Sequence, residues 1–149
     1  VKLRAVPLAE TIQRVIDREG AAAVKLNVDV PDDLKVNADP TLLARALGNL
    51  LRNAVRYAGQ AGPIELSACR ESNRVKIIIS DRGPGIPADD LPRIFDPFSR
   101  PEKARSRDTG GAGIGLSIVK SCVEACGGTV TGANRDPNGL EFSVVLESA

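Results

Sequence analysis

Residues 81–116 read DRGPGIPADDLPRIFDPFSRPEKARSRDTGGAGIGL and hold a glycine cluster at each end. A carboxylate, Asp81, heads the first cluster, and a basic segment with prolines separates the two. Glycine has no Cβ, so its backbone can adopt a positive φ or approach a flat ligand closely. Either cluster alone is more typical of an ordinary turn than of a binding site. The two together predict a nucleotide pocket with a lid between its walls.

The first cluster follows a predicted strand. Residues 75–80 read VKIIIS, an apolar run rich in β-branched residues that is typical of a buried strand. Asp81 therefore points out of a strand end, with Gly83 and Gly85 directly after it. Its carboxylate can accept a hydrogen bond from an exocyclic amine such as that of adenine.

The second cluster runs into a predicted helix. Apolar residues recur at helical spacing from Leu116 to Cys126, and glycines 127–128 end the pattern. A glycine-rich turn before a helix N-terminus offers free N–H groups to phosphate oxygens. The spacing G-x-G-x-G is not that of a dinucleotide fold, and no G-x-x-x-x-G-K-[ST] loop occurs, so a less common way of holding a nucleotide is indicated. The glycines of this cluster are Gly110, Gly111, Gly113 and Gly115.

Length and charge limit the classes of protein to consider. A chain of 149 residues with 42% hydrophobic content predicts one domain, residues 1–149, that buries roughly 70% of its unfolded surface. The net charge of +1 excludes a general basic field for nucleic acid or an anionic membrane. No apolar run approaches the roughly 18 residues of a spanning helix, and the first residues lack the charged-then-apolar layout of a signal peptide. We expect a soluble domain that contacts neither nucleic acid nor membrane.

Methionine and histidine are both absent from the chain. The lack of methionine indicates a piece of a longer chain, and the lack of histidine excludes a His-based zinc site and a Ser/His/Asp triad. The three cysteines, Cys69, Cys122 and Cys126, lack metal-ligand spacing. Their odd number predicts reduced, buried thiols in a reducing compartment.

Periodicity predicts an α+β fold. Helices are expected over residues 9–19, from Asp39-Pro40 to about residue 57, and over 116–126. Single strands are expected at 24–30 and 34–36, and two hairpins pair 64–70 with 75–80 and 129–133 with 140–146. The result is a two-layer α/β sandwich, with about three main helices on a mixed, largely antiparallel sheet.

The long central helix carries Arg45, Asn49, Asn53 and Arg56 at i, i+4, i+8 and i+11 on one face. For the arginines alone, a solvated face is a sufficient explanation. Asparagine, however, is a poor interior helix residue, because its side chain competes for backbone hydrogen bonds. Two asparagines one turn apart therefore suggest a task, and their amide oxygens could face a hard cation such as Mg²⁺.

Together these motifs resemble the catalytic and ATP-binding domain of sensor histidine kinases, in the wider family that includes DNA gyrase B, mismatch-repair MutL and heat-shock chaperone ATPases. NLLRNAVRY at 49–57 resembles the N box, and DRGPGI at 81–86 the first glycine box. IFDPFSR at 94–100 resembles the F box, and GAGIGL at 111–116 the second glycine box. The resemblance covers almost the whole chain and implies the Bergerat ATP-binding fold, with a mobile ATP lid at about residues 87–110.

The resemblance also implies roles for single residues. Asp81 would read the adenine amine, Tyr57 would pack against the base, and Arg56 would contact phosphate. Phe95 and Phe98 would anchor the lid. The catalytic set would be Asn49, Asn53 and Arg100, with Arg100 on the γ-phosphate and with Asn53 and Asn49 as the ligands of Mg²⁺. The cofactor-binding set would be Asn49, Asn53, Arg56, Tyr57, Asp81, Gly83, Gly85, Ile86, Gly111, Gly113, Gly115 and Leu116.

Asn49 bears on whether the domain hydrolyses ATP or transfers its phosphate. Members that hydrolyse ATP carry a glutamate at the corresponding position, and an uncharged amide cannot be that general base. We therefore expect transfer of the γ-phosphate to a histidine on a separate dimerisation domain of the same protein, for relay to a response regulator. The expected location is cytoplasmic, as part of a membrane-bound sensor. The alternatives are an ATPase clamp of the gyrase or chaperone type, a nucleotide-binding regulatory module without phosphotransfer, and a related serine kinase.

One motif departs from the family pattern. Near the last strand the family often has Gly-Thr-x-Phe, whose hydroxyl supports the adenine-binding aspartate, whereas this chain has Gly139-Leu140-Glu141-Phe142. Another group or a water molecule must replace that hydroxyl.

Overall fold

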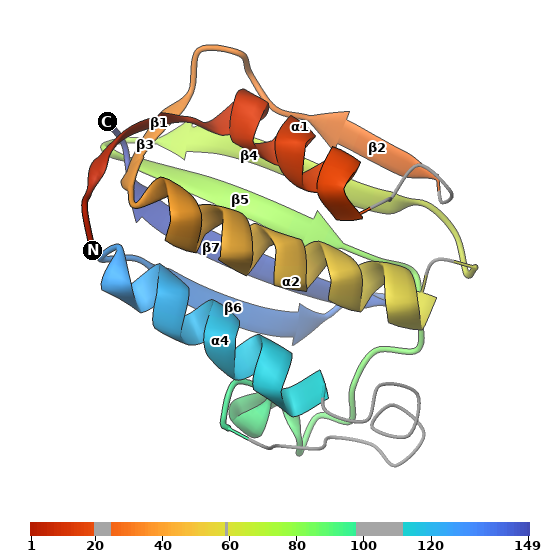
Figure 1. Cartoon of the computed structure of the whole chain (residues 1–149). Helices are drawn as coiled ribbons and strands as arrows, with labels where there is room; N and C mark the ends of the chain where they lie inside the picture. Colours follow the sequence, from red (N-terminus) through yellow and green to blue (C-terminus); the bar gives the residue numbers. More distant parts are fainter. Residues whose placement is uncertain (20–24, 59, 98–111) are drawn as a thin grey trace.

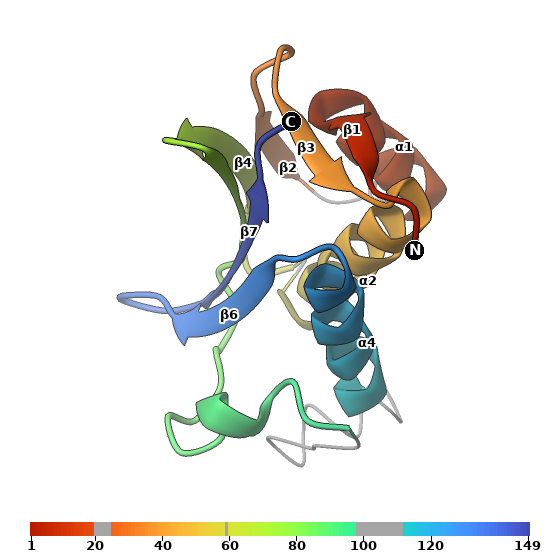
Figure 2. The same ribbon diagram turned by 90° about the vertical axis from the view of Figure 1, so that its left-hand side faces the viewer.

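Three helices lie side by side on one face of a sheet, in a computed structural model that describes residues 1–19, 25–58, 60–97 and 112–149 (Figure 1). The helices are α1 (Leu8–Glu19), α2 (Pro40–Ala58) and α4 (Ala112–Ala125). For residue 57 and residues 112–114 only the backbone is described. Figure 2 shows the molecule from the side, with the helical layer on one side of the sheet and no described helix or strand covering its other face. The predicted two-layer sandwich is confirmed.

The main sheet has five strands in the order β2-β4-β5-β7-β6. Strand β2 runs parallel to β4, and every other neighbouring pair is antiparallel, so the predicted mixed, largely antiparallel sheet is confirmed. Along each central strand, side chains alternate between the core and the open face, as the pleat requires. The strand bounds are β2 Leu26–Asp29, β4 Ile64–Glu71, β5 Arg74–Ser80, β6 Thr129–Asn134 and β7 Leu140–Glu147.

A second, two-stranded sheet pairs β1 (Arg4–Pro7) with β3 (Lys35–Ala38). The sequence predicts no strand at residues 4–7, and it places the second strand at 34–36. A four-residue segment ending in proline has no strand periodicity of its own. It becomes a strand because the chain brings residues 35–38 beside it, so this sheet is a product of tertiary pairing.

Helix α2 begins where its capping residue predicts. The Oδ1 of Asp39 accepts hydrogen bonds from the N–H groups of Thr41 at 2.9 Å and Leu42 at 3.2 Å. Its Oδ2 accepts another from the N–H of Lys2 at 2.9 Å. These bonds, the one from Lys2 foremost, hold the pKa of the Asp39 carboxyl below its usual value. The cap fixes the start of α2 and ties the N-terminal segment to it.

Helix α4 differs from its prediction, because it begins at Ala112 and not at Leu116. Gly113 and Gly115 therefore lie within its first turns. Glycine disfavours a helix interior by roughly 1 kcal/mol relative to alanine, so the sequence pattern places the helix start after the glycines. Packing of α4 along α2 overrides that local preference.

Two predictions about exposure are wrong. Strand β2, expected to be half-buried, lies at the sheet edge and is mostly exposed. Cys122 and Cys126 are buried free thiols as predicted, but Cys69 is an exposed free thiol. Because neighbouring residues of a strand point to opposite faces, Ala68 enters the core and Cys69 faces solvent on the open side of the sheet.

Candidate functional site

Asp81 lies at the end of β5 and is 2% exposed. Its Oδ1 accepts two main-chain hydrogen bonds, from Gly83 N at 2.9 Å and from Leu140 N at 3.1 Å. The N–H of Asp81 in turn donates to the carbonyl oxygen of Leu140 at 3.0 Å. No residue in the described ranges donates to Oδ2. The carboxylate is therefore fixed through one oxygen and keeps the other as an acceptor for a ligand.

At Leu140, the main chain and not a side-chain hydroxyl supports Asp81. The sequence has no hydroxyl at this residue, and the N–H of the same residue donates to Asp81. The Leu140 side chain is fully buried, so it anchors the donor in the core. The main chain at residue 140 therefore supports the aspartate, as a main-chain N–H can do whichever side chain the residue carries.

Close packing explains two glycines of the first glycine box. A Cβ on Gly83 would lie 2.7 Å from the Cβ of Ala58, at the C-terminal end of α2. Gly85 has a φ of +74°, and a Cβ there would lie 2.6 Å from the Oδ1 of Asn134. Ile86 follows and is buried. The box is thus pressed against α2 on one side and against the β6–β7 turn on the other, with no space for larger residues.

The asparagine face of α2 is held by an ion pair that the sequence analysis missed. The Nη1 of Arg52 donates to the Oδ1 of Asn49 at 2.8 Å. The same guanidinium binds both carboxylate oxygens of Glu19, at the end of α1, at 3.0 and 2.8 Å. A carboxamide oxygen has two lone pairs, so Asn49 retains one for another partner. Asn49 and Asn53 are both partly buried.

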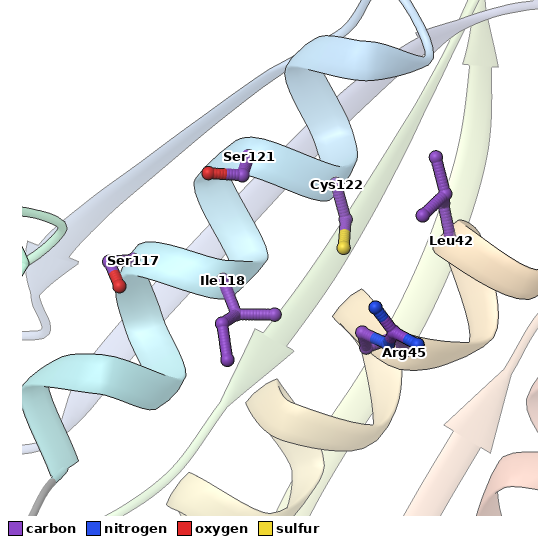
Figure 3. Close-up of a pocket in the computed structure, with 6 residues that line it drawn as sticks. All are labelled: Leu42, Arg45, Ser117, Ile118, Ser121 and Cys122. Atoms are coloured by element: carbon purple, nitrogen blue, oxygen red, sulfur yellow. The ribbon is translucent and has the colours of Figure 1, made fainter. Parts of the chain in front are cut away.

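Helices α2 and α4 run side by side in opposite directions (Figure 1). Between them lies a groove of about 290 Å³, whose residues Figure 3 draws. Burial raises the pKa of the Cys122 thiol in this groove, and the Arg45 guanidinium opposes that shift. The groove is lined by Leu42, Arg45, Ser117, Ile118, Ser121 and Cys122.

Because α2 and α4 are antiparallel, the N box and the second glycine box lie near each other. Asn49 and Asn53 follow Arg45 by one and two turns, toward the C-terminal end of α2. The antiparallel partner at that end is the start of α4, which contains Gly113 and Gly115. The structure therefore brings the N box and the helical part of the second glycine box to the same end of the helical layer, as the resemblance implies.

The described part of the F box is anchored in the core. Ile94 is fully buried, and the Phe95 ring meets Phe142 edge to face with centroids 6.0 Å apart. A Cβ on Gly132 of β6 would come within 2.7 Å of Ile94 Cδ1, so the strand has glycine where this residue packs. The anchoring role expected for Phe95 is thus supported by its packing on β7.

Part of the expected site lies outside the described residues, namely Phe98, Arg100, Gly110, Gly111 and the side chain of Tyr57. The other expected site residues lie in three parts of the chain. Asn49, Asn53 and Arg56 lie on α2. Asp81, Gly83, Gly85 and Ile86 lie at and after the end of β5, and Gly113, Gly115 and Leu116 open α4.

The sequence analysis also missed three residues that contact the first glycine box. Asn134 is the last residue of β6, and Arg135 and Asn138 belong to the β6–β7 turn. All three donate to main-chain carbonyls of the first glycine box. Their only signal in the sequence is a run of turn formers, NRDPNG at 134–139, which predicts the turn and not its contacts.

Within the described residues, no group of three His, Cys, Asp or Glu side chains could hold a metal ion. The oxygen donors on α2 are amides, which suit a hard cation that keeps most of its water and binds substrate phosphates. The chemistry of this donor set therefore fits Mg²⁺ and not a transition metal. In the same part of the chain, no helix is both long and apolar enough to cross a membrane.

Comparison with known proteins agrees with this geometry. The family model described as histidine kinase-, DNA gyrase B-, and HSP90-like ATPase matches residues 38–149. The sensor-like histidine kinase SenX3 of Mycobacterium tuberculosis is 37% identical over 139 residues, which cover 93% of this chain and 34% of that protein. The sensor histidine kinase CusS of Escherichia coli K12 is 39% identical over 142 residues, covering 93% of this chain and 29% of that protein. The chain thus spans about a third of the length of these relatives.

Solved structures share the fold over nearly the whole chain. The mycobacterial sensor histidine kinase MprB superimposes with a TM-score of 0.85 at 27% identity, covering 99% of this chain and 98% of that one. The catalytic domain of histidine kinase ThkA gives a TM-score of 0.83 at 27% identity, covering 99% and 96%. Full-length ShkA, solved in complex with AMPPNP, gives 0.81 at 28% identity, covering 100% of this chain and 32% of that one.

Proposed function

The chain belongs to the family of histidine kinase-, DNA gyrase B- and HSP90-like ATPases, as the catalytic ATP-binding domain of a two-component sensor histidine kinase, and from this we propose how its residues work. It binds Mg-ATP and presents the γ-phosphate to a histidine on a separate dimerisation domain of the same protein. That domain passes the phosphate to a response regulator. We place the reaction in the cytoplasm.

The environment of Asp81 supports the proposal that the pocket binds adenine. Asp81 is buried, its Oδ1 is fixed by two main-chain N–H groups, and no described residue donates to Oδ2. A buried carboxylate needs hydrogen bonds to stay charged away from water. The exocyclic amine of adenine would donate to Oδ2, so the base is selected by its hydrogen-bonding edge. Gly83 and Gly85 let the main chain pack closely against Ala58 and Asn134, and Ile86 would pack against the base.

The phosphates would lie between α2 and α4. Asn53, with Asn49, would hold Mg²⁺, which neutralises phosphate charge when bound. Arg52 uses one lone pair of the Asn49 oxygen and fixes the orientation of its carboxamide. Arg56 on α2 and Arg100 in the lid would contact phosphate oxygens, and the main chain at Gly111, Gly113 and Gly115 would contribute N–H groups. Leu116, which is buried, secures the start of α4.

The phosphate acceptor is not in these 149 residues, since they contain no histidine. A neutral imidazole is already a competent nucleophile, so transfer requires positioning and charge neutralisation and no general base on this domain. An asparagine at residue 49 is consistent with that requirement, because an amide cannot activate water for hydrolysis.

The test mixes this chain and Mg-ATP with the dimerisation domain of the parent protein, in one form with its histidine and in one form with alanine there. We expect acid-labile phosphate on the first form and none on the second. Binding of ATP without transfer would replace the kinase by a nucleotide-binding regulatory module. Release of inorganic phosphate by this chain alone would favour an ATPase clamp instead.

A further inference from the structure

Side chains from the end of β6 and from the β6–β7 turn hold the first glycine box in place. Asn134 makes two hydrogen bonds with one residue of the box. Its Oδ1 accepts from Ile86 N at 2.8 Å, and its Nδ2 donates to Ile86 O at 2.5 Å. The carboxamide thus pairs with both main-chain groups of Ile86, as a neighbouring strand would. This fixes the far end of the box.

Two further side chains fix the near end. The Nη1 of Arg135 donates to the carbonyl oxygen of Asp81 at 3.1 Å, and its Nη2 lies 3.3 Å from the Oε1 of Glu65. The Nδ2 of Asn138 donates to the carbonyl oxygen of Arg82 at 2.6 Å. The ion pair with Glu65, on β4, ties this guanidinium to the sheet. The main chain is therefore held at residues 81, 82 and 86.

The first glycine box and the β6–β7 turn also come into contact at two glycines, Gly85 and Gly139. Gly85 and Gly139 both have positive φ angles, of 74° and 115°. A Cβ on Gly85 would lie 2.6 Å from Asn134 Oδ1, and a Cβ on Gly139 would overlap the carbonyl oxygen of Asp81. Contact this close leaves the box no room to slide against the turn while the hydrogen bonds are made.

The first glycine box contains Gly83, whose main-chain N–H orients the Asp81 carboxylate. Asp81 Oδ1 is bonded to Gly83 N, which lies between the two fixed ends of the box, and to Leu140 N, which directly follows the turn. A shift of the box relative to the turn would move these two donors apart and rotate the carboxylate. The direction of its second oxygen therefore depends on the side chains of the turn.

We propose that Asn134, assisted by Arg135 and Asn138, is a positioning residue that sets the base selectivity of the pocket. It acts through Asp81 and does not touch the nucleotide. By holding the first glycine box against the end of β6 and the β6–β7 turn, it keeps Oδ2 of Asp81 aimed at an exocyclic amine of a purine. This inference rests on the proposed function, because it concerns the same adenine site.

The test measures the Kd of ADP and of inosine diphosphate, whose base has a carbonyl where adenine has its amine. Wild type should bind ADP more tightly. Asn134→Ala removes two part-buried hydrogen bonds, so the Kd of ADP should rise about five- to thirtyfold. The Kd of inosine diphosphate should change less than about twofold, because its base does not use the aspartate.

Three companion variants make the result specific. Asn134→Asp keeps the acceptor for Ile86 N and loses the donor to Ile86 O, so its Kd for ADP should be intermediate. Asn138→Ala should shift selectivity in the same direction by a smaller factor, and it tests the idea independently should Asn134→Ala not fold. Asn73→Ala, in the exposed β4–β5 turn, is the matched control and should bind both nucleotides as wild type does.

Each outcome has a distinct meaning. Wild type that binds neither nucleotide would overturn the proposed function itself. Wild type that binds ADP, with an unchanged ratio of the two Kd values in Asn134→Ala and Asn138→Ala, would overturn the positioning role alone. Equal weakening of both nucleotides together with a lower Tm would assign these residues to stability and also overturn it. A loss of selectivity at an unchanged Tm is the expected result.

Discussion

Replacement of Asp81 by asparagine tests the adenine pocket with a minimal change of shape. The new carboxamide can keep its oxygen toward Gly83 N and Leu140 N, which donate to Oδ1 at 2.9 and 3.1 Å. Its NH₂ group then occupies the place of Oδ2. The acceptor offered to the base becomes a donor, while the support from the main chain is unchanged.

The magnitude follows from the hydrogen bond that is lost. A bond between a neutral donor and a charged acceptor contributes about 1.5–3 kcal/mol, which corresponds to a rise in Kd of about 10- to 150-fold. The facing NH₂ groups of asparagine and adenine add to this loss. Asp81 is only 2% exposed, so removing its charge should leave the Tm unchanged or raise it.

Isothermal titration with ADP and with inosine diphosphate measures both effects. The variant should lose affinity for ADP and gain relative affinity for inosine diphosphate, since the carboxamide can donate to the carbonyl of that base. Asp33→Asn, at an exposed site in the β2–β3 connection, removes a charge of the same kind and should change neither Kd. Unchanged ADP affinity in a folded Asp81→Asn protein would show that the base lies elsewhere.

Three other predictions concern the framework around the pocket. Arg52→Ala should lower the free energy of unfolding by about 1 kcal/mol, because it breaks a two-point pair with Glu19, and in a double-mutant cycle the loss should shrink to the share of the Asn49 bond once Glu19 is already alanine. Iodoacetamide at pH 8 should modify the exposed Cys69 rapidly and Cys122 slowly, since burial shields the latter and raises its pKa; equal rates followed by mass spectrometry would contradict this. The Asp39 carboxyl has a pKa lowered by folding, so its stabilising contribution is present above the unfolded value of 3.8 and is lost as the pH falls through the folded value; the stability gap between wild type and Asp39→Ala in denaturant titrations should therefore close in acid.

The local parts of the fold could be predicted because their signals are local. The hairpin of β4 and β5 has alternating apolar residues on both sides of a tight turn, and Asp39 caps α2 with bonds to residues two and three positions along the chain. Strand β1 could not be predicted, since it exists only through its pairing with β3. The predicted start of α4 lies too late in the chain, because Gly113 and Gly115 disfavour a helix locally. Their helical conformation depends on packing against α2.

By itself, the sequence predicted the chemical kind of pocket that we propose. Its short motifs specify residue types within a few positions of one another: a carboxylate after a strand, glycines where the main chain must come close, and two amides one helical turn apart. Tertiary structure alone decided what holds these groups in place. The second donor to Asp81 is 59 residues away, and the carboxamide that clamps Ile86 is 48 residues away. One of these contacts is a main-chain N–H, which every residue except proline carries, so no residue type marks it in the sequence.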